Sequence, residues 1–164
     1  MYIETPRLLL RDMRADDIAA LVALWSDAEV TRYLGGPRKP TSLRATFEET
    51  LAHGPEPYDL YPVVEKDSGA VIGHCGLLDK EIEGVVEIEL VYVLARAYWG
   101  RGYATEIARA IVADTFARRG LKRLVALIEP GNAASERVAL EAGMALEKEV
   151  VRPGGRVMRL YAMG

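Results

Sequence analysis

The chain has 164 residues, of which 50% are hydrophobic and 27% are charged, and its formal net charge at pH 7 is -3. This length fits one domain with a buried core, so we expect a single domain over residues 1–164. The slightly acidic balance argues against a nucleic-acid partner, and no apolar stretch approaches the roughly 20 residues of a membrane-spanning helix.

The first part of the chain predicts one strand followed by helices. Residues 7–13 form an apolar run suited to a strand. Asp16 is the expected N-cap of a helix whose apolar side chains recur at helical spacing, namely Ile18, Leu21, Val22 and Trp25. Further helices are expected over residues 27–34 and from Thr41 to about His53.

The middle of the chain predicts an antiparallel meander. Three strand-like runs lie at residues 60–66, 70–78 and 85–95. Asp67-Ser68-Gly69 joins the first two runs, and this turn composition suits a hairpin.

The last third alternates helices and strands. Its clearest helix ends before Gly120 and has one continuous apolar face, made of Ala104, Ile107, Ala108, Ile111, Val112, Thr115 and Phe116. A strand is expected over residues 121–129, a helix over 132–142, and a final strand pair over 144–151 and 156–163. The whole order is β, α-rich, β-β-β, α, β, α, β-β.

The segment YWGRGYATE, residues 98–106, places two glycines directly before the clearest helix. Glycine reaches positive φ without strain, and its missing side chain lets an anion approach the main chain. Free N–H groups at a helix start can bind a phosphate. The segment matches neither a Walker loop nor a dinucleotide fingerprint. From its residues alone, it is either a phosphate site or a plain turn into a helix.

Few residues are available for metal or redox chemistry. Cys75 is the only cysteine, which excludes an internal disulfide, and with two histidines, His53 and His74, no cluster of Cys and His ligands stands out. Charged residues interrupt the N-terminal apolar run, unlike the core of a signal peptide. We therefore expect a cytoplasmic protein without a metal.

Three segments, ETPRLLLRDMRADD, ELVYVLARAYWGRGYATE and PGNAASERVALEAGM, together with the order of elements, resemble the GNAT family of acyl-CoA-dependent N-acyltransferases. Within it they look most like the ribosomal-protein N-terminal acetyltransferase branch, and the resemblance covers nearly the whole chain. It implies an α+β fold with a central, mixed, mostly antiparallel twisted sheet of about seven strands flanked by helices. It also implies acetyl-CoA as cosubstrate and a primary amine as acceptor, either a protein or peptide N-terminus or a small amine.

The resemblance also implies which residues contact coenzyme A. In this family the glycine turn holds the pyrophosphate, and residues 88–94 form a strand that carries a bulge and splays from its parallel neighbour to admit the pantetheine arm. Trp99 stands where the family has glutamine or arginine, so the main-chain part of the turn carries over most directly. The implied contacts are Tyr92, Val93, Leu94, Trp99, Gly100, Arg101, Gly102, Tyr103, Ala104, Thr105, Asn132 and Ser135.

Acetyl transfer to an amine requires a neutral nucleophile, a donor for the oxyanion and a proton for the departing thiolate. By resemblance Glu89 is the expected general base, while Glu87 lies on the same strand face by alternation and His74 is another candidate. The alternative for both glutamates is a solvated strand face. The family's tyrosine near the sulfur falls at Ala139, so Ser135 is the expected proton donor, with water as the substitute.

Two readings remain open for the whole chain. The first is an N-acetyltransferase that works by direct transfer in a ternary complex, as a monomer or homodimer. The second is a coenzyme-binding regulatory or interaction module without turnover. Release of free thiol from acetyl-CoA in the presence of amines separates them.

Overall fold

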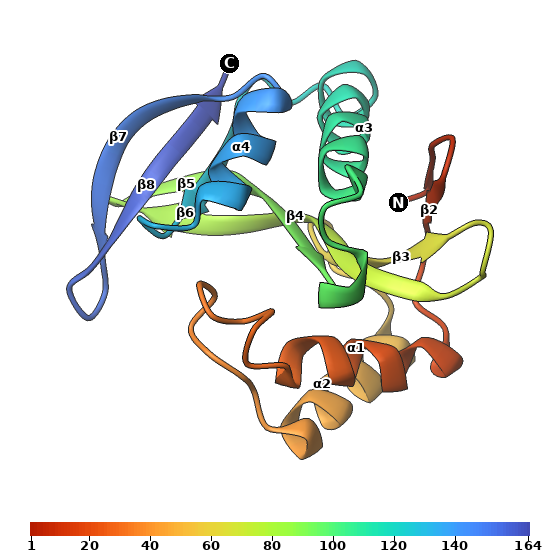
Figure 1. Cartoon of the computed structure of the whole chain (residues 1–164). Coiled ribbons are helices and arrows are strands. Elements are labelled where there is room, and N and C mark those ends of the chain that lie inside the picture. Colours follow the sequence, from red (N-terminus) through yellow and green to blue (C-terminus); the bar gives the residue numbers. More distant parts are fainter.

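A single sheet connects the two ends of the chain. The computed structural model describes residues 1–164, and its strands pair in the order β1-β2-β3-β4-β5-β6-β8-β7 (Figure 1). The strands are β1 (Ile3–Glu4), β2 (Leu8–Leu10), β3 (Leu60–Glu65), β4 (Val71–Ile82), β5 (Val85–Leu94), β6 (Leu124–Ile128), β7 (Ala145–Arg152) and β8 (Arg156–Met163). The sheet therefore has eight strands instead of the expected seven or so, and the additional one is the two-residue β1.

Almost all strand pairs are antiparallel, which confirms the predicted meander and the predicted final strand pair. The exception is the parallel pair of β5 and β6, whose one register pair is Glu89 with Val125. Beyond this pair β5 continues to Leu94 without β6 at its side. The sheet therefore opens between β5 and β6 at the carboxyl end of β5.

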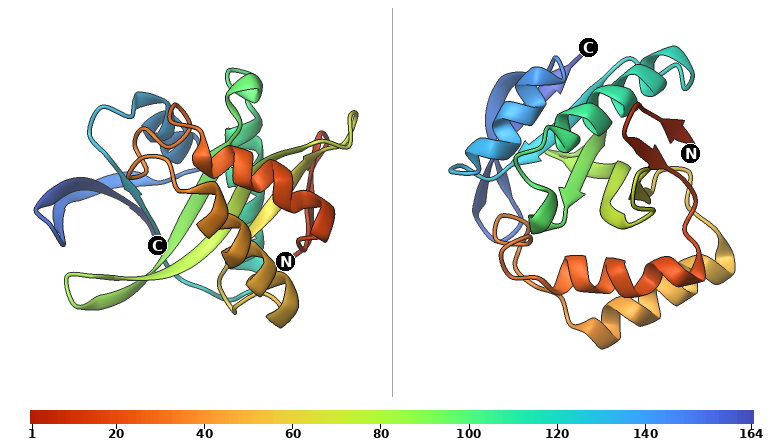
Figure 2. Two further views of the ribbon diagram at one scale, coloured as in Figure 1. Left: turned by 90° about the horizontal axis from the view of Figure 1, so that it is seen from below. Right: turned by 45° about the vertical axis from the view of Figure 1, so that its right-hand side comes forward.

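Helices cover both faces of the sheet. The helices are α1 (Ile18–Ser26), α2 (Pro40–His53), α3 (Tyr103–Ala117) and α4 (Ala133–Glu141). Figure 2 shows α1 and α2 side by side on the face opposite α3. Strand alternation divides β5 between two hydrophobic clusters, because Leu90 and Leu94 pack in the cluster of α3 whereas Val93 packs in the cluster of α1 and α2. No helix combines the length and the hydropathy that a membrane span needs.

Two local predictions were wrong. The stretch predicted as a helix over residues 27–34 forms successive turns instead. The Asp27 carboxylate accepts the N–H groups of Glu29 and Val30 as a helix N-cap would. After the Thr31 N–H bonds the Asp27 carbonyl, however, the next main-chain bonds span only three residues, so the helix does not continue. Asp16 is exposed and does not cap α1. The neighbouring Asp17 is buried instead, where it accepts from the Arg14 N–H at 2.7 Å and pairs with the Arg11 guanidinium.

Candidate functional site

The glycine turn before α3 has the conformation that the sequence predicts. Gly100 and Gly102 have φ values of 75° and 79°, and Gly102 is the left-handed N-cap of α3. The first main-chain bond of the helix runs from the Glu106 N–H to the Gly102 carbonyl. The N–H groups of residues 100–105 therefore have no main-chain acceptor, and together with the helix dipole they can bind an anion.

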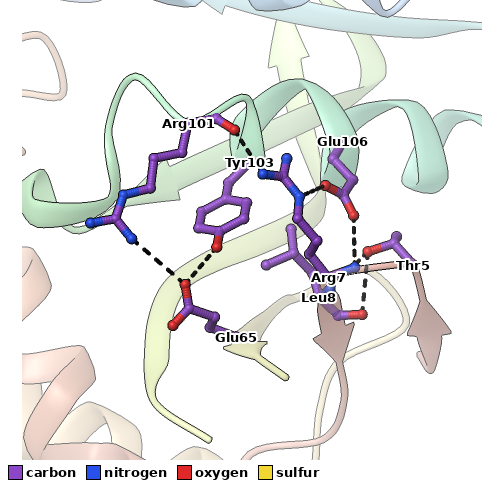
Figure 3. Close-up of polar contacts among 7 residues, drawn as sticks. All are labelled: Thr5, Arg7, Leu8, Glu65, Arg101, Tyr103 and Glu106. Carbon is purple, nitrogen blue, oxygen red and sulfur yellow. Dashed lines mark hydrogen bonds and ion pairs between the residues drawn. The ribbon is translucent and has the colours of Figure 1, made fainter. Parts of the chain in front are cut away.

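Arg7 holds this turn from the segment between β1 and β2 (Figure 3). Its Nη1 donates to the Arg101 carbonyl at 2.9 Å, and its Nε and main-chain N–H both bond the Glu106 carboxylate in the first turn of α3. The guanidinium also lies 4.3 Å from the centre of the Tyr103 ring. The turn is therefore fixed by groups outside it.

Glu65 of β3 holds the side chains that point away from this turn. The Tyr103 hydroxyl donates to its carboxylate, and Arg101 Nη1 lies 3.9 Å from the same group (Figure 3). The hydrogen bond from Tyr103 lowers the pKa of Glu65, and the same bond raises the pKa of Tyr103. Since the Arg101 side chain turns toward Glu65, only its main chain remains with the glycine turn.

The opening in the sheet does not come from a bulge in β5, as the resemblance implied. The register of β4 and β5 runs without a shift from Gly73–Leu94 to Ile82–Val85, so the gap exists because β6 pairs with β5 at one position only. The Ala95 N–H bonds the Ile72 carbonyl of β4. By alternation the main-chain groups of Tyr92 and Leu94 face the gap, whereas those of Val93 face β4.

Trp99 takes part in this opening through its side chain. The indole Nε1–H donates to the Leu94 carbonyl at 2.8 Å, while 48% of the residue surface remains exposed. The main chains of Tyr92 and Leu94 both face the gap. The indole occupies the Leu94 carbonyl and leaves the Tyr92 carbonyl without this bond. Trp99 also fixes the end of β5 relative to the glycine turn.

The start of α4 lies across the gap from β5. The Asn132 carboxamide accepts the Ser135 N–H at 3.3 Å, so Asn132 is the N-cap of α4. Ser135 lies in the first helical turn, and its side chain contacts Tyr92 of β5. The Tyr92 hydroxyl donates to the Ser135 carbonyl at 2.7 Å, and the Ser135 hydroxyl donates to the Tyr92 oxygen at 3.2 Å.

These elements enclose one cavity of about 520 Å³. Its wall combines the end of β5, the glycine turn, the start of α4 and, from the loop between α1 and α2, residues 29, 30 and 32–34. All the residues predicted to contact coenzyme A line it except Arg101. The predicted residues that line it are Tyr92, Val93, Leu94, Trp99, Gly100, Gly102, Tyr103, Ala104, Thr105, Asn132 and Ser135.

Glu89 does not line this cavity. It is 6% exposed and occupies the same face of β5 as Val91 and Val93, which pack toward α1 and α2. Lys80 of β4 places its Nζ 2.7 Å from Glu89 Oε2 in an ion pair, although the alignment is not that of a hydrogen bond. Glu87 is bonded by the Arg123 guanidinium. Neither predicted carboxylate is therefore free of a cation.

His74 is held as a neutral side chain between the sheet and α1. Its Nδ1 accepts from Trp25 Nε1 at 3.0 Å, and the Phe47 ring packs edge-on against it. Burial lowers the pKa of His74 to about 4. Burial likewise raises the pKa of the Cys75 thiol to about 12. Both side chains are buried in the protein interior, and neither lines the cavity.

A family model described as the acetyltransferase (GNAT) domain matches residues 7–145. The chain belongs to the GNAT acetyltransferase family. The matched residues include the glycine turn, the end of β5 and the start of α4, so the described cavity lies within the GNAT domain.

Known proteins resemble this GNAT chain along nearly its whole length. The uncharacterized protein YkkB of Bacillus subtilis (strain 168) is 35% identical over 149 residues, which cover 89% of this chain and 86% of that protein. A GNAT-family acetyltransferase structure from Bacillus anthracis has a TM-score of 0.84 and 25% identity, covering 99% of this chain and 98% of that one. The structure of RimL, a ribosomal L7/L12 alpha-N-protein acetyltransferase in complex with coenzyme A, has a TM-score of 0.79, 19% identity and coverage of 99% and 97%. At that identity the likeness to RimL shows the fold.

Sequence reasoning missed the groups that hold the site together. Arg7 and Glu106 were visible only as charged residues, and Tyr92 was expected as a coenzyme A contact without its side-chain bond to Ser135. The one signal for Arg7 was its place in the segment ETPRLLLR, where it interrupts an apolar run. Nothing in the sequence shows that this residue reaches residues 101 and 106.

Proposed function

We propose that this protein transfers an acetyl group from acetyl-CoA to a primary amine by direct attack in a ternary complex. The observation that carries this proposal is the shared cavity. The N–H groups of residues 100–105 lack main-chain acceptors, and their turn lines the same cavity as Tyr92, Asn132 and Ser135. An anion-binding end and a hydroxyl-bearing end thus lie on one continuous surface.

The residues present fit coenzyme A. The glycine turn at the start of α3 would hold the pyrophosphate, since its donors and the helix dipole both favour a negative charge. The main chain of Tyr92 and the Asn132 side chain would meet the pantetheine arm along the open edge of β5. Bound acetyl-CoA supplies an activated thioester. The coenzyme A complex of RimL, which shares this fold, supports the assignment.

The acceptor side is proposed to lie on the face of the sheet that carries Glu89. This carboxylate is buried and belongs to the opposite face of β5 from Tyr92. We propose Glu89 as the general base, acting through a water molecule after Lys80 moves aside. Lys80 can do so because its side chain is 35% exposed.

The acceptor is proposed to be a protein or peptide N-terminus in preference to a lysine side chain. An α-amino group has an ordinary pKa of about 7.7 to 8.0, against about 10.4 for lysine. A base that is paired with a cation therefore removes the proton of an α-amino group more easily than the proton of a lysine side chain. RimL, named as an alpha-N-protein acetyltransferase, supports the same direction. We also propose that the protein works in the cytoplasm as a monomer or homodimer.

A coenzyme-binding module without turnover is the second candidate. The observation that favours it is the pairing of both candidate carboxylates with cations, Glu89 with Lys80 and Glu87 with Arg123. Such a module would bind acetyl-CoA and leave the thioester intact.

One experiment tests the proposal and separates the candidates. Acetyl-CoA affinity is measured by titration calorimetry, and thiol release is then followed with a free-N-terminus peptide, its N-terminally blocked form with one lysine, and a small primary amine. We expect micromolar-range binding and release that depends on an amine, fastest with the free N-terminus. Binding without amine-dependent release supports the module, and absence of binding refutes both candidates.

A further inference from the structure

Tyr92 and Ser135 form a pair of hydroxyl groups that joins β5 to α4 at the cavity wall. Tyr92 donates to the Ser135 carbonyl at 2.7 Å and accepts from the Ser135 hydroxyl at 3.2 Å. The Ser135 N–H is held by Asn132. Both side chains are half-buried and line the cavity. The position of the Ser135 hydroxyl is therefore set from both sides of the open sheet edge.

Two other hydroxyl groups on the cavity wall are bonded to carboxylates. The Tyr103 hydroxyl donates to Glu65, and the Thr105 hydroxyl donates to Glu141 at 2.7 Å. Ala139, one turn beyond Ser135, carries no donor and is fully buried. Ser135 is thus a hydroxyl whose hydrogen can turn into the cavity by rotation about one bond while its oxygen stays in place.

Acetyl transfer creates a need for such a donor. When the thioester C–S bond breaks, its electron pair goes to sulfur, while the carbonyl re-forms and the new C–N bond remains. The amine proton goes to water or a carboxylate, and the thiolate finally takes a proton from water. A hydrogen bond that is made to sulfur as its charge develops lowers the barrier.

The resemblance to the GNAT family already implies Ser135 as the donor to the departing sulfur. We propose that Tyr92 is the positioning residue that holds Ser135 in place for that step. This inference rests on the proposed acetyl transfer. Tyr92 remains a fixed neutral group because burial raises its pKa to about 12, well above the ordinary value of about 8.5 for a thiol. Tyr92 therefore keeps its proton on the Ser135 carbonyl throughout turnover.

The first test is a double-mutant cycle on kcat. Ser135→Ala should lower kcat about 10- to 100-fold, the range for one hydrogen bond to a charged group. Tyr92→Phe should lower kcat about 5- to 50-fold, with acetyl-CoA affinity within about twofold of the wild-type value. In the Ser135→Ala background, Tyr92→Phe should cost nothing further, because its effect passes through Ser135. Equal costs of Tyr92→Phe in both backgrounds would overturn the proposal.

The second test changes the leaving group and leaves the binding contacts unchanged. The selenium analogue of acetyl-CoA releases a selenolate, which is a more stable anion and needs less stabilisation. With this substrate, the ratio of wild-type kcat to variant kcat should fall toward one for both Tyr92→Phe and Ser135→Ala. A purely structural Tyr92 would lower kcat equally with both substrates, and that result would also overturn the proposal.

The control variant is Tyr61→Phe, which removes a buried phenolic hydroxyl from β3, away from the cavity. Its kcat should match the wild-type value, and melting temperatures of all variants show whether each is folded. Wild-type protein that binds acetyl-CoA without releasing thiol would refute the proposed acetyl transfer and this inference with it. Normal wild-type turnover with an unaffected Tyr92→Phe variant would refute this inference alone.

Discussion

The glycine turn at residues 100–105 and the carboxylate of Glu89 are held in contrasting ways. Arg7 and Glu65, from distant parts of the chain, fix the turn and its flanking side chains, and none of these contacts uses the free N–H groups. Glu89 is held by Lys80 of the adjacent strand, and that contact uses the carboxylate itself. The free N–H groups of the turn are already available to an anion, whereas Glu89 would have to lose its Lys80 partner to act as the proposed base.

The largest expected effect comes from removing the charge of Glu89. Glu89→Gln keeps the shape, and if the carboxylate is the base, kcat near neutral pH should fall about 100-fold. The loss should be partly restored at high pH, where the free amine is already deprotonated. The measurement is a pH profile of kcat by thiol release, with Glu87→Gln as the matched variant. An unchanged kcat with only a raised acceptor KM would make Glu89 a binding residue.

The next effect concerns the turn itself. Gly102→Val should weaken acetyl-CoA binding about 10- to 100-fold, because φ is 79° and a Cβ would lie 3.5 Å from the Arg7 guanidinium, at the N-terminus of α3. Calorimetric titration measures the dissociation constant. Gly69→Val is the control, since Gly69 also has a positive φ of 71° but lies in the β3–β4 turn with nothing nearby. If the folded Gly102→Val protein binds as tightly as wild type, the turn is not the phosphate site.

A smaller effect should follow from loosening the groups that hold the turn. Glu106→Gln removes the charge that Arg7 contacts at 2.7 Å and should weaken acetyl-CoA binding about 3- to 10-fold, since the turn remains but is less rigid. Burial opposes the charged form, yet contacts that include the main-chain and side-chain hydrogen bonds from Arg7 lower the pKa of Glu106 overall.

That lowered pKa gives the pH dependence a definite sign. A carboxyl whose pKa is lower in the folded state stabilises the protein above its unfolded pKa, and this stabilisation is lost as the pH falls through the folded pKa. The melting temperature of wild type should therefore exceed that of Glu106→Gln at pH 7, and the difference should shrink in acid. A difference that stays constant down to pH 3 would contradict a charge-based contact.

The smallest effect on activity is expected at Asp17, on the far side of the sheet from the turn. Burial disfavours its charge, but hydrogen bonds from Arg11 and the Arg14 N–H lower its pKa. Asp17→Asn should destabilise the fold by about 1 to 3 kcal/mol, the cost of weakening a buried charge-assisted contact. Its acetyl-CoA affinity should stay within about twofold of wild type. A large loss of affinity would show that the start of α1 supports the cavity.

Most elements could be predicted from the sequence because their signals are local. The apolar face from Ala104 to Phe116 and the turn at Asp67-Ser68-Gly69 correspond to α3 and the β3–β4 hairpin. The helix predicted over residues 27–34 does not form, because after Asp27 the main-chain bonds do not continue in the four-residue pattern of an α-helix. Gly35 and Gly36, both with positive φ, then end the segment.

The sequence by itself determined the conformation of the glycine turn. Two glycines before an amphipathic helix specify a left-handed N-cap with unpaired N–H groups through main-chain sterics alone. Only the tertiary structure decided the rest. The salt bridge from Lys80 to Glu89, the contact of Arg7 with residues 101 and 106, and the Tyr92–Ser135 pair join residues 9 to 99 positions apart. Such pairs depend on strand register and on the packing of α4 against β5, which no local sequence pattern encodes.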